Sequence, residues 1–244
     1  MLIGRETELD KLVRNLREGV HTLVFGASGT GKTALLREAA SRLGGNTESE
    51  PFAVYIGDCS DRRTLLESAL AGLGCNYRCA GGATSFSHKL VQNRRVQDLR
   101  NAFIAQNRVQ HLCLLLDGLP GLHHRLERLL EMLEQHCTLG CAVTARADAY
   151  DLYYWKFDKI EVKELPARLA FSWVDQELGH MDYTGPLKRG IAQEILRLAG
   201  GNPGSISETL GVIRRQSRRL DDPIRVRRMF IDGWLDRFKR ISGA

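Results

Sequence analysis

One glycine-rich stretch decides the fold of this 244-residue chain: Gly26-Ala27-Ser28-Gly29-Thr30-Gly31-Lys32-Thr33. It matches the pattern G-x-x-x-x-G-K-S/T. An apolar run of strand length, residues 21–25, precedes the stretch, and a segment of helical periodicity, residues 34–40, follows it. A strand, a glycine-rich turn and a helix in this order are the context that the motif requires. The pattern therefore predicts a phosphate-binding loop.

The residue types in this loop suit a nucleoside triphosphate. Glycines let backbone N–H groups turn inward around a β-phosphate, and the start of the following helix adds its positive end. We expect Lys32 to reach the β- and γ-phosphates and the Thr33 hydroxyl to bind Mg²⁺. The next residue, Ala34, is given no role. The loop from Gly26 to Thr33 thus predicts binding of ATP, or a closely related nucleotide, with Mg²⁺.

Strand-length apolar runs alternate along the chain with longer segments of helical period. The expected strands are His21–Gly26, Phe52–Asp58, His111–Asp117, Gly140–Thr144 and Lys159–Val162. The helices expected around them are Glu6–Glu18, Lys32–Leu43, Arg62–Leu73, Leu90–Gln106 and Arg125–Gln135. This alternation predicts an α/β fold, with a parallel five-stranded sheet flanked by helices.

The strand pattern stops near Pro166, and only helical segments follow. They are Ala167–Leu178, Leu187–Leu198, Ser205–Arg219 and Ile224–Arg240. We expect a nucleotide-binding domain at 1–165, a helical lid at 166–222 and a basic C-terminal helix at 223–244. Within the first domain, the segment Gly74–Ser87 is rich in Gly, Ser and Ala without periodicity, which predicts an exposed loop.

A second site element is the apolar strand that ends at Asp117. The carboxyl edge of a parallel sheet is where ligands bind, so Asp117 is expected to complete the Mg²⁺ site with Thr33. Gly118 follows directly, and the next acidic residue is Glu127. No general base is therefore evident beside the metal, and the sequence favours nucleotide binding over rapid hydrolysis.

A third element is the strand that ends at Thr144, followed by Arg146. We expect this strand to lie between the strands that lead to Lys32 and Asp117. Thr144 and Arg146 are then candidates to contact the γ-phosphate or to position a water molecule. An exposed arginine after a strand is also common without any such role, so both interpretations stay open.

The net charge is +6, and its placement is uneven. From Gly211 to Ala244 there are ten basic residues and four acidic ones, which accounts for the whole excess. Such a basic segment could bind a polyanion such as double-stranded DNA. A solvated helix face is the equal alternative, because no interleaved aromatic residues indicate single-strand binding.

The sequence contains no apolar run of membrane-spanning length, and its amino terminus is charged from Arg5 onward. We therefore expect a cytoplasmic protein with reduced thiols and no membrane partner. Two cysteine pairs, Cys75/Cys79 and Cys137/Cys141, have C-x-x-x-C spacing, whereas structural zinc sites usually use C-x-x-C. Buried structural cysteines are favoured over zinc.

Four short segments of the sequence together resemble motifs of the AAA+ and STAND branches of the P-loop ATPases, especially origin-recognition-like and transposition-regulator-like members. Residues 2–9 look like the h-h-G-R-x-x-E-L opening, which implies that Leu2 and Ile3 lie near the adenine. Residues 117–119 are similar to the D-G-L form of the Walker B motif, and residues 143–146 to the sensor strand. Residues 201–204 resemble the G-x-P turn of the helical lid, which places Pro203 near the nucleotide.

The resemblance implies a nucleotide-dependent switch. The sensor-2 arginine of many AAA+ lids is missing from the turn at 201–204, which weakens the case for a full hydrolysis apparatus. We expect a slow ATPase that assembles on DNA as a ring or filament and recruits or regulates a protein partner. A STAND-type signalling switch without DNA binding is the alternative. A metabolite kinase is the least favoured possibility, since no substrate motif accompanies the loop.

Overall fold

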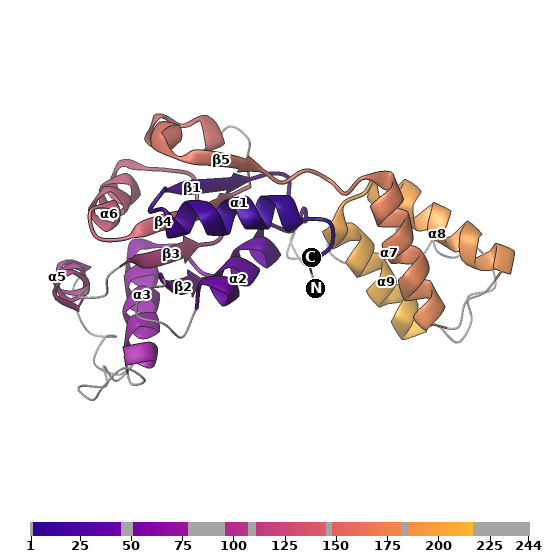
Figure 1. The fold of residues 1–244 in the computed structure, drawn as a ribbon, viewed down its shortest axis with the longest axis horizontal. Coiled ribbons are helices and arrows are strands. Elements are labelled where there is room, and N and C mark those ends of the chain that lie inside the picture. Colours follow the sequence, from indigo (N-terminus) through magenta and orange to yellow (C-terminus); the bar gives the residue numbers. More distant parts are fainter. Residues whose placement is uncertain are drawn as a thin grey trace, which may run out of the picture. The chain divides into compact units, whose positions relative to one another are not determined.

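The computed structural model describes residues 2–44, 51–77, 96–106, 111–144, 148–181 and 185–216. Its contacts divide the chain into two compact units. The first comprises Met1–Ala27 and Lys32–Val162, and the second comprises Ser28–Gly31 and Lys163–Ala244. Figure 1 labels the elements of both units.

A parallel sheet of five strands forms the centre of the first unit. The strands are β1 (Thr22–Phe25), β2 (Phe52–Ile56), β3 (Leu112–Leu116), β4 (Thr138–Val143) and β5 (Asp158–Glu161). They lie in the order β2-β3-β4-β1-β5, and every neighbouring pair is parallel. Figure 1 shows this order from β5 at the top to β2 at the bottom. The predicted fold class is confirmed, and so is the position of the strand before Thr144 between the other two site strands.

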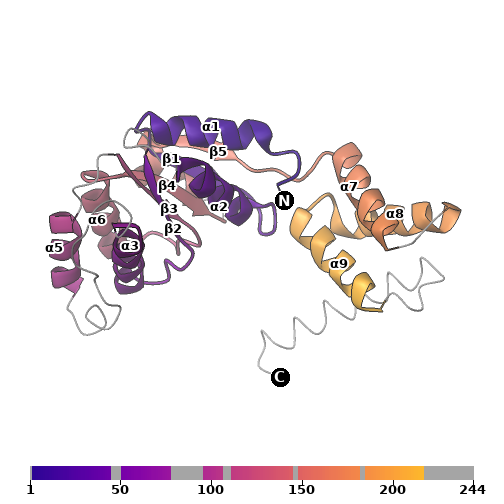
Figure 2. The same cartoon turned by 60° about the horizontal axis from the view of Figure 1, so that its bottom comes forward.

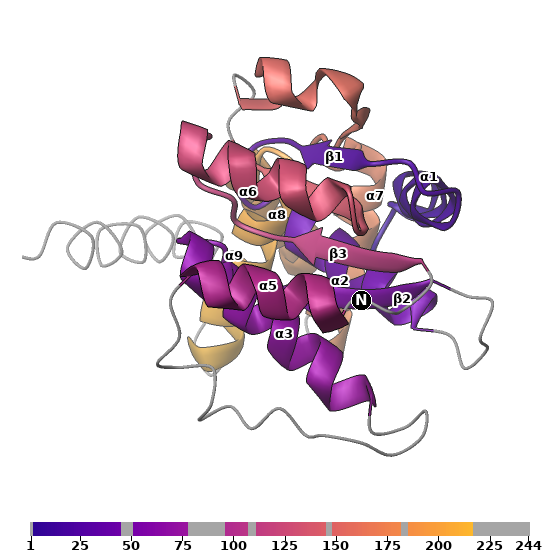
Figure 3. The ribbon, with the colours of Figure 1, turned by 90° about the vertical axis from the view of Figure 1, so that its left-hand side faces the viewer.

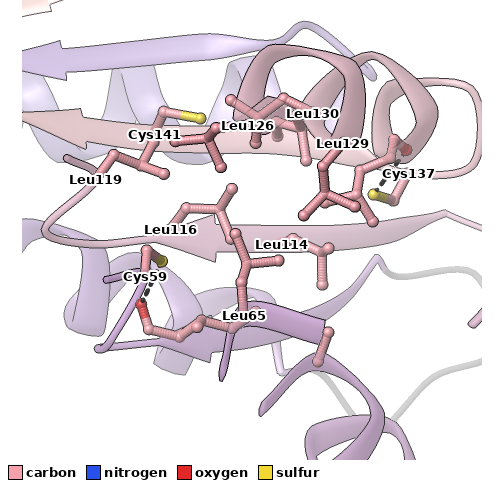
Figure 4. Close-up of a cluster of buried hydrophobic side chains, with 14 of the residues drawn as sticks. Cys59, Leu65, Leu114, Leu116, Leu119, Leu126, Leu129, Leu130, Cys137 and Cys141 are labelled. Atoms are coloured by element: carbon pink, nitrogen blue, oxygen red, sulfur yellow. Dashed lines mark hydrogen bonds between the residues drawn. The ribbon is translucent and has the colours of Figure 1, made fainter. Parts of the chain in front are cut away.

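Both faces of the sheet are covered, which explains why the interior strand β3 is apolar throughout. Leu112, Leu114 and Leu116 of β3 belong to one buried cluster, whereas Cys113 and Leu115 belong to another. Successive side chains of a strand point to opposite faces, so β3 contributes to two cores at once. Figure 4 shows part of the first core, where Leu114 and Leu116 lie close to side chains of α6.

Helices cover each face of the sheet. Against one face pack α1 (Glu6–Arg17) and α2 (Lys32–Leu43). The other face is covered by α3 (Arg62–Tyr77), α5 (Val96–Gln106), α6 (His124–Glu134) and the short 3₁₀ helices η1 (Asp148–Tyr150) and η2 (Leu152–Lys156). Figure 3 shows α3 and α5 lying side by side.

Polar contacts hold α1 against the edge of the sheet. Asn15 Nδ2 donates to Thr22 Oγ1 at 3.1 Å and to Asp158 Oδ2 at 2.6 Å. Lys11 Nζ donates to Asp158 Oδ1 at 3.0 Å. The helix thereby lies alongside β1 and β5, as Figure 2 shows. This arrangement connects the amino-terminal segment to the strand that precedes the glycine-rich loop.

The second unit is helical in the part that the structure describes. It contains α7 (Ala167–His180), α8 (Gly185–Ala199) and α9 (Pro203–Gln216). Their apolar faces form one core, whose fully buried members include Val174, Leu178, Ile191, Ile195, Ile206 and Ile213. Pro166 and Pro203 lie at the starts of α7 and α9, where the missing N–H of proline costs little.

Beyond small shifts in the ends of elements, the structure departs from the sequence prediction at the end of α3 and at residues 148–156. Helix α3 continues to Tyr77, so Gly74–Tyr77 is helical and not part of a loop. A glycine inside a helix costs only about 1 kcal/mol, which the packing of α3 can offset. The 3₁₀ helices at 148–156 were not predicted, because short helices have no clear periodicity.

Some predicted segments lie outside the described residues. They are 78–87 of the predicted loop, 90–95 of the helix now seen as α5, and the helix at Ile224–Arg240. Among the residues that are described, no helix is both long and apolar enough to cross a membrane.

Candidate functional site

The glycine-rich loop begins where β1 ends and runs directly into α2. Gly29 has φ +80° and Gly31 has φ +103°, in the left-handed region that L side chains rarely adopt. A Cβ at Gly31 would meet nothing within 4 Å, so lack of space is not the reason for glycine there. The reason is the backbone conformation. These two residues give the loop the turns by which backbone N–H groups could surround a phosphate.

Lys32 is buried at the first turn of α2. Its Nζ donates to Gly26 O and to Ala27 O, both at 2.8 Å. An ammonium group has three N–H donors, so one remains for a phosphate oxygen. Burial lowers the pKa of Lys32, and the negative charge of Asp117 opposes that change. The ammonium group of Lys32 is thus held against the first two residues of the loop. The charge of Asp117 acts on it there.

Asp117 lies directly after β3 and is buried. Its backbone N–H donates to Ile56 O at 2.9 Å, which extends the β2–β3 pairing by one residue. Its Oδ2 accepts a hydrogen bond from the Tyr55 hydroxyl at 2.8 Å. One carboxylate oxygen is therefore engaged by the protein, and the other is left for a cation or a water bound to it.

Thr33 and Thr144 complete the set of polar candidates in the first unit. Thr33, the second residue of α2, is exposed and offers a hydroxyl oxygen. Thr144 is also exposed and follows β4, which lies between β3 and β1. Arg146 lies outside the described residues. The oxygens of Thr33 and Asp117 are the donor type that Mg²⁺ prefers, so these residues fit that ion.

At the amino terminus, Leu2 and Ile3 are partly buried, and Leu2 packs against the core formed by α1 and α2. Gly4 has φ +60°, and Arg5 is buried with its Nη1 3.0 Å from Glu8 Oε1. The segment is therefore folded against the first unit. Apolar side chains of this kind could contact a flat base.

In the second unit, the turn at Gly201–Gly204 contacts the loop residues of the same unit. Asn202 Nδ2 donates to Ser28 O at 2.8 Å, and the Gly204 N–H donates to Gly29 O at 2.8 Å. Asn202 Oδ1 also accepts from the N–H groups of Gly204 and Ser205, so Asn202 caps α9. Pro203 is the first residue of that helix.

A family model described as "AAA ATPase domain" matches residues 1–142, which is more than half of the chain. The chain belongs to the AAA ATPase domain family. The sequence prediction of a P-loop ATPase of AAA+ type is thereby confirmed. The match does not distinguish a STAND subtype. Among curated proteins, no sequence matches this chain significantly.

Three solved structures share the fold at 14% sequence identity. PCH-2 of C. elegans has a TM-score of 0.56, with 95% of this chain and 67% of that chain covered. AMPPCP-bound DnaA of Aquifex aeolicus gives 0.52, with 88% and 63% covered. Drosophila ORC bound to DNA gives 0.55, with 94% and 65% covered. This AAA ATPase chain thus spans about two thirds of the length of those chains.

Sequence reasoning missed two residues at this candidate site. No local sequence pattern indicates the hydrogen bond between Tyr55 and Asp117, because the two residues are 62 positions apart in the chain. Asn202 had one: an asparagine directly before a helix-starting proline is typical of an N-cap. The contact of Asn202 with Ser28 depends on tertiary structure and could not be predicted from that pattern.

Four cysteines are buried, namely Cys59, Cys113, Cys137 and Cys141, and a buried position favours the thiol over the thiolate. Burial raises the pKa of Cys59 and of Cys113 to about 12. It also raises the pKa of Cys137 and Cys141. Within the described residues, no three His, Cys, Asp or Glu side chains are grouped to hold a metal ion. Cys79 lies outside those residues.

Proposed function

We propose that this AAA ATPase is an ATP-binding switch that hydrolyses slowly and assembles in an ATP-dependent way on double-stranded DNA, where it recruits or regulates a protein partner. The observation that carries the proposal is the combination at one sheet edge. Lys32 and Asp117 are buried and electrostatically coupled, whereas the residue after Asp117 is a glycine. Such a site has groups suited to holding a nucleotide, and the position directly after Asp117 carries no carboxylate to activate water.

Each site residue has a proposed role. Lys32 contacts the β- and γ-phosphates, and backbone N–H groups of the Gly26–Thr33 loop surround them. Thr33 and Asp117 hold Mg²⁺, which when bound neutralises phosphate charge. Leu2 and Ile3 contact the base. Pro203, Thr144 and Arg146 are proposed to lie near the nucleotide, the last two toward the γ-phosphate.

DNA is the proposed polyanion because of the charge distribution. Ten basic residues against four acidic ones between Gly211 and Ala244 give that segment the entire net charge of the chain. Basic segments of this density bind phosphate backbones through counterion release. One structure that shares the fold, Drosophila ORC, is bound to DNA. Homo-oligomerisation as a ring or filament and a cytoplasmic location are part of the same proposal.

The proposal is tested by measuring mass with light scattering, with and without ATP, Mg²⁺ and double-stranded DNA. The wild type should gain mass only when ATP and DNA are both present, and the gain should disappear at high salt. Lys32→Ala should stay at its starting mass in every condition. An ATP-dependent gain that needs no DNA would favour the alternative, a STAND-type protein-interaction switch. No ATP-dependent change at all would contradict both.

A further inference from the structure

Tyr55 is the one described side chain that hydrogen bonds to the Asp117 carboxylate. It is the penultimate residue of β2 and donates its hydroxyl to Asp117 Oδ2 at 2.8 Å. The phenol O–H is therefore the donor and the carboxylate oxygen is the acceptor.

The register of the sheet brings these two side chains together. Tyr55 pairs with Leu115, and residues two apart on a strand share a face, so Tyr55 and Asp117 are diagonal neighbours on one face. Gly57 follows on the same face of the chain. A Cβ there would lie 3.2 Å from Tyr55 Cε1 and 3.3 Å from its hydroxyl oxygen. Glycine at this position leaves the space that the phenol occupies.

The ring of Tyr55 also faces α2, the helix that begins with Lys32. The guanidinium carbon of Arg37 lies 5.1 Å from the ring centroid, within the range of a cation–π contact. Tyr55 further packs against the core that α2 shares with β3. The phenol is thus fixed between the helix that follows the phosphate loop and the carboxylate that ends β3.

We propose that Tyr55 is a positioning residue for the metal site: its hydroxyl holds Asp117 Oδ2 so that the other carboxylate oxygen faces Mg²⁺. A carboxylate turns readily about its terminal bond, and a hydrogen bond to one oxygen restricts that rotation. Hydrogen bonds of this kind to metal-binding carboxylates commonly change metal affinity by about 10- to 100-fold. The inference rests on the proposed binding of Mg²⁺ and ATP.

The test is the Mg²⁺ dependence of ATP binding in Tyr55→Phe, which removes only the hydroxyl. The variant should need about tenfold more Mg²⁺ for half-maximal ATP binding. Its ATP affinity in EDTA should be unchanged, because no metal is then present to be positioned. In an Asp117→Asn background, adding Tyr55→Phe should produce no further change, since coupled residues are not additive.

Tyr153→Phe is the matched control, because Tyr153 also donates its hydroxyl to a carboxylate, that of Glu134. It should leave the Mg²⁺ dependence as in the wild type. Gly57→Ala provides a second route, because its Cβ would stand 3.2 Å from Tyr55 Cε1 and 3.3 Å from the hydroxyl oxygen and so crowd the phenol without removing the hydroxyl. It should shift the Mg²⁺ requirement in the same direction as Tyr55→Phe. Thermal melting without nucleotide shows that each variant is folded.

The possible failures are distinguishable. A wild type that binds no ATP overturns the proposed function. A wild type that binds ATP with Mg²⁺, beside a Tyr55→Phe variant with the same Mg²⁺ requirement or a lower one, overturns the inference about Tyr55 alone. An equal shift in Tyr153→Phe would show a general effect on the fold and would also overturn it.

Discussion

Gly118 occupies the position directly after Asp117, where a carboxylate could activate a water molecule. It has φ +65°, and a Cβ at this position would meet nothing within 4 Å. The backbone therefore favours glycine, but the surrounding space would accept a side chain. A left-handed conformation costs roughly 1–2 kcal/mol for an L residue, which is a tolerable loss for a folded domain. The position directly after Asp117 thus carries no carboxylate, because its backbone favours glycine.

Gly118→Glu should raise the rate of ATP hydrolysis, because it places a carboxylate directly after Asp117. General bases contribute about 10²- to 10⁴-fold, and we expect a gain of at least about tenfold in the strained position. Gly118→Gln is the control, as it carries the same strain without the charge. Steady-state phosphate release measures the effect. Equal rates in the two variants would contradict the account of slow turnover.

At the scale of elements, the predictable features are those encoded locally. The glycine loop, the apolar run before Asp117 and the prolines at the starts of α7 and α9 each carry their own signal. The predicted end of α3 was wrong because Gly74–Tyr77 was assigned to a loop on its composition and lack of periodicity. The Tyr55–Asp117 bond could not be predicted, since it requires the pairing register of β2 and β3 as well as the side-chain rotamers.

Helix α3 offers a test of how a local signal stabilises an element. Asp61 precedes the helix, and its Oδ1 accepts from the N–H groups of Arg63 and Thr64 at 2.7 and 3.1 Å. Asp61→Ala should lower the free energy of unfolding by about 1 kcal/mol at neutral pH. Chemical denaturation measures this change. Asp61→Asn keeps an acceptor and should lose much less.

The same aspartate should make stability depend on pH. Hydrogen bonds from Thr64, first from its side chain, hold the pKa of Asp61 below the ordinary value of 3.8. Because folding lowers this pKa, the stabilisation is present above the unfolded pKa and is lost as pH falls through the folded one. Asp61→Asn should therefore have a shallower loss of stability below about pH 4 than the wild type. An identical acid limb would contradict the capping role.

In the whole molecule, the residues proposed to bind the nucleotide and the basic residues proposed to bind DNA belong to different segments of the chain. The loop and Asp117 serve the nucleotide, whereas the basic excess lies after Gly211. We therefore expect changes in the basic segment to leave ATP affinity unaltered and to alter only the electrostatic part of DNA binding.

Replacing Arg227 and Arg228 by alanine should weaken DNA binding at all sequences alike. The slope of log affinity against log salt should become shallower by about one for each phosphate that the variant no longer neutralises. Arg197→Ala is the control, because Arg197 is exposed and paired with Glu194 at 2.7 Å. Fluorescence anisotropy with labelled duplex measures both. A salt slope unchanged in the double variant would exclude these arginines from the interface.

We propose that the loop and Asp117 form a switch that holds Mg²⁺ and ATP without rapid turnover. The most direct test is one equilibrium titration of ATP with Mg²⁺, by calorimetry, with phosphate release measured on the same sample. We predict saturable binding in the wild type, none in Lys32→Ala, and turnover well below the roughly 10 per second of a typical enzyme. Absence of binding in the wild type, or turnover at that typical rate, would contradict the account.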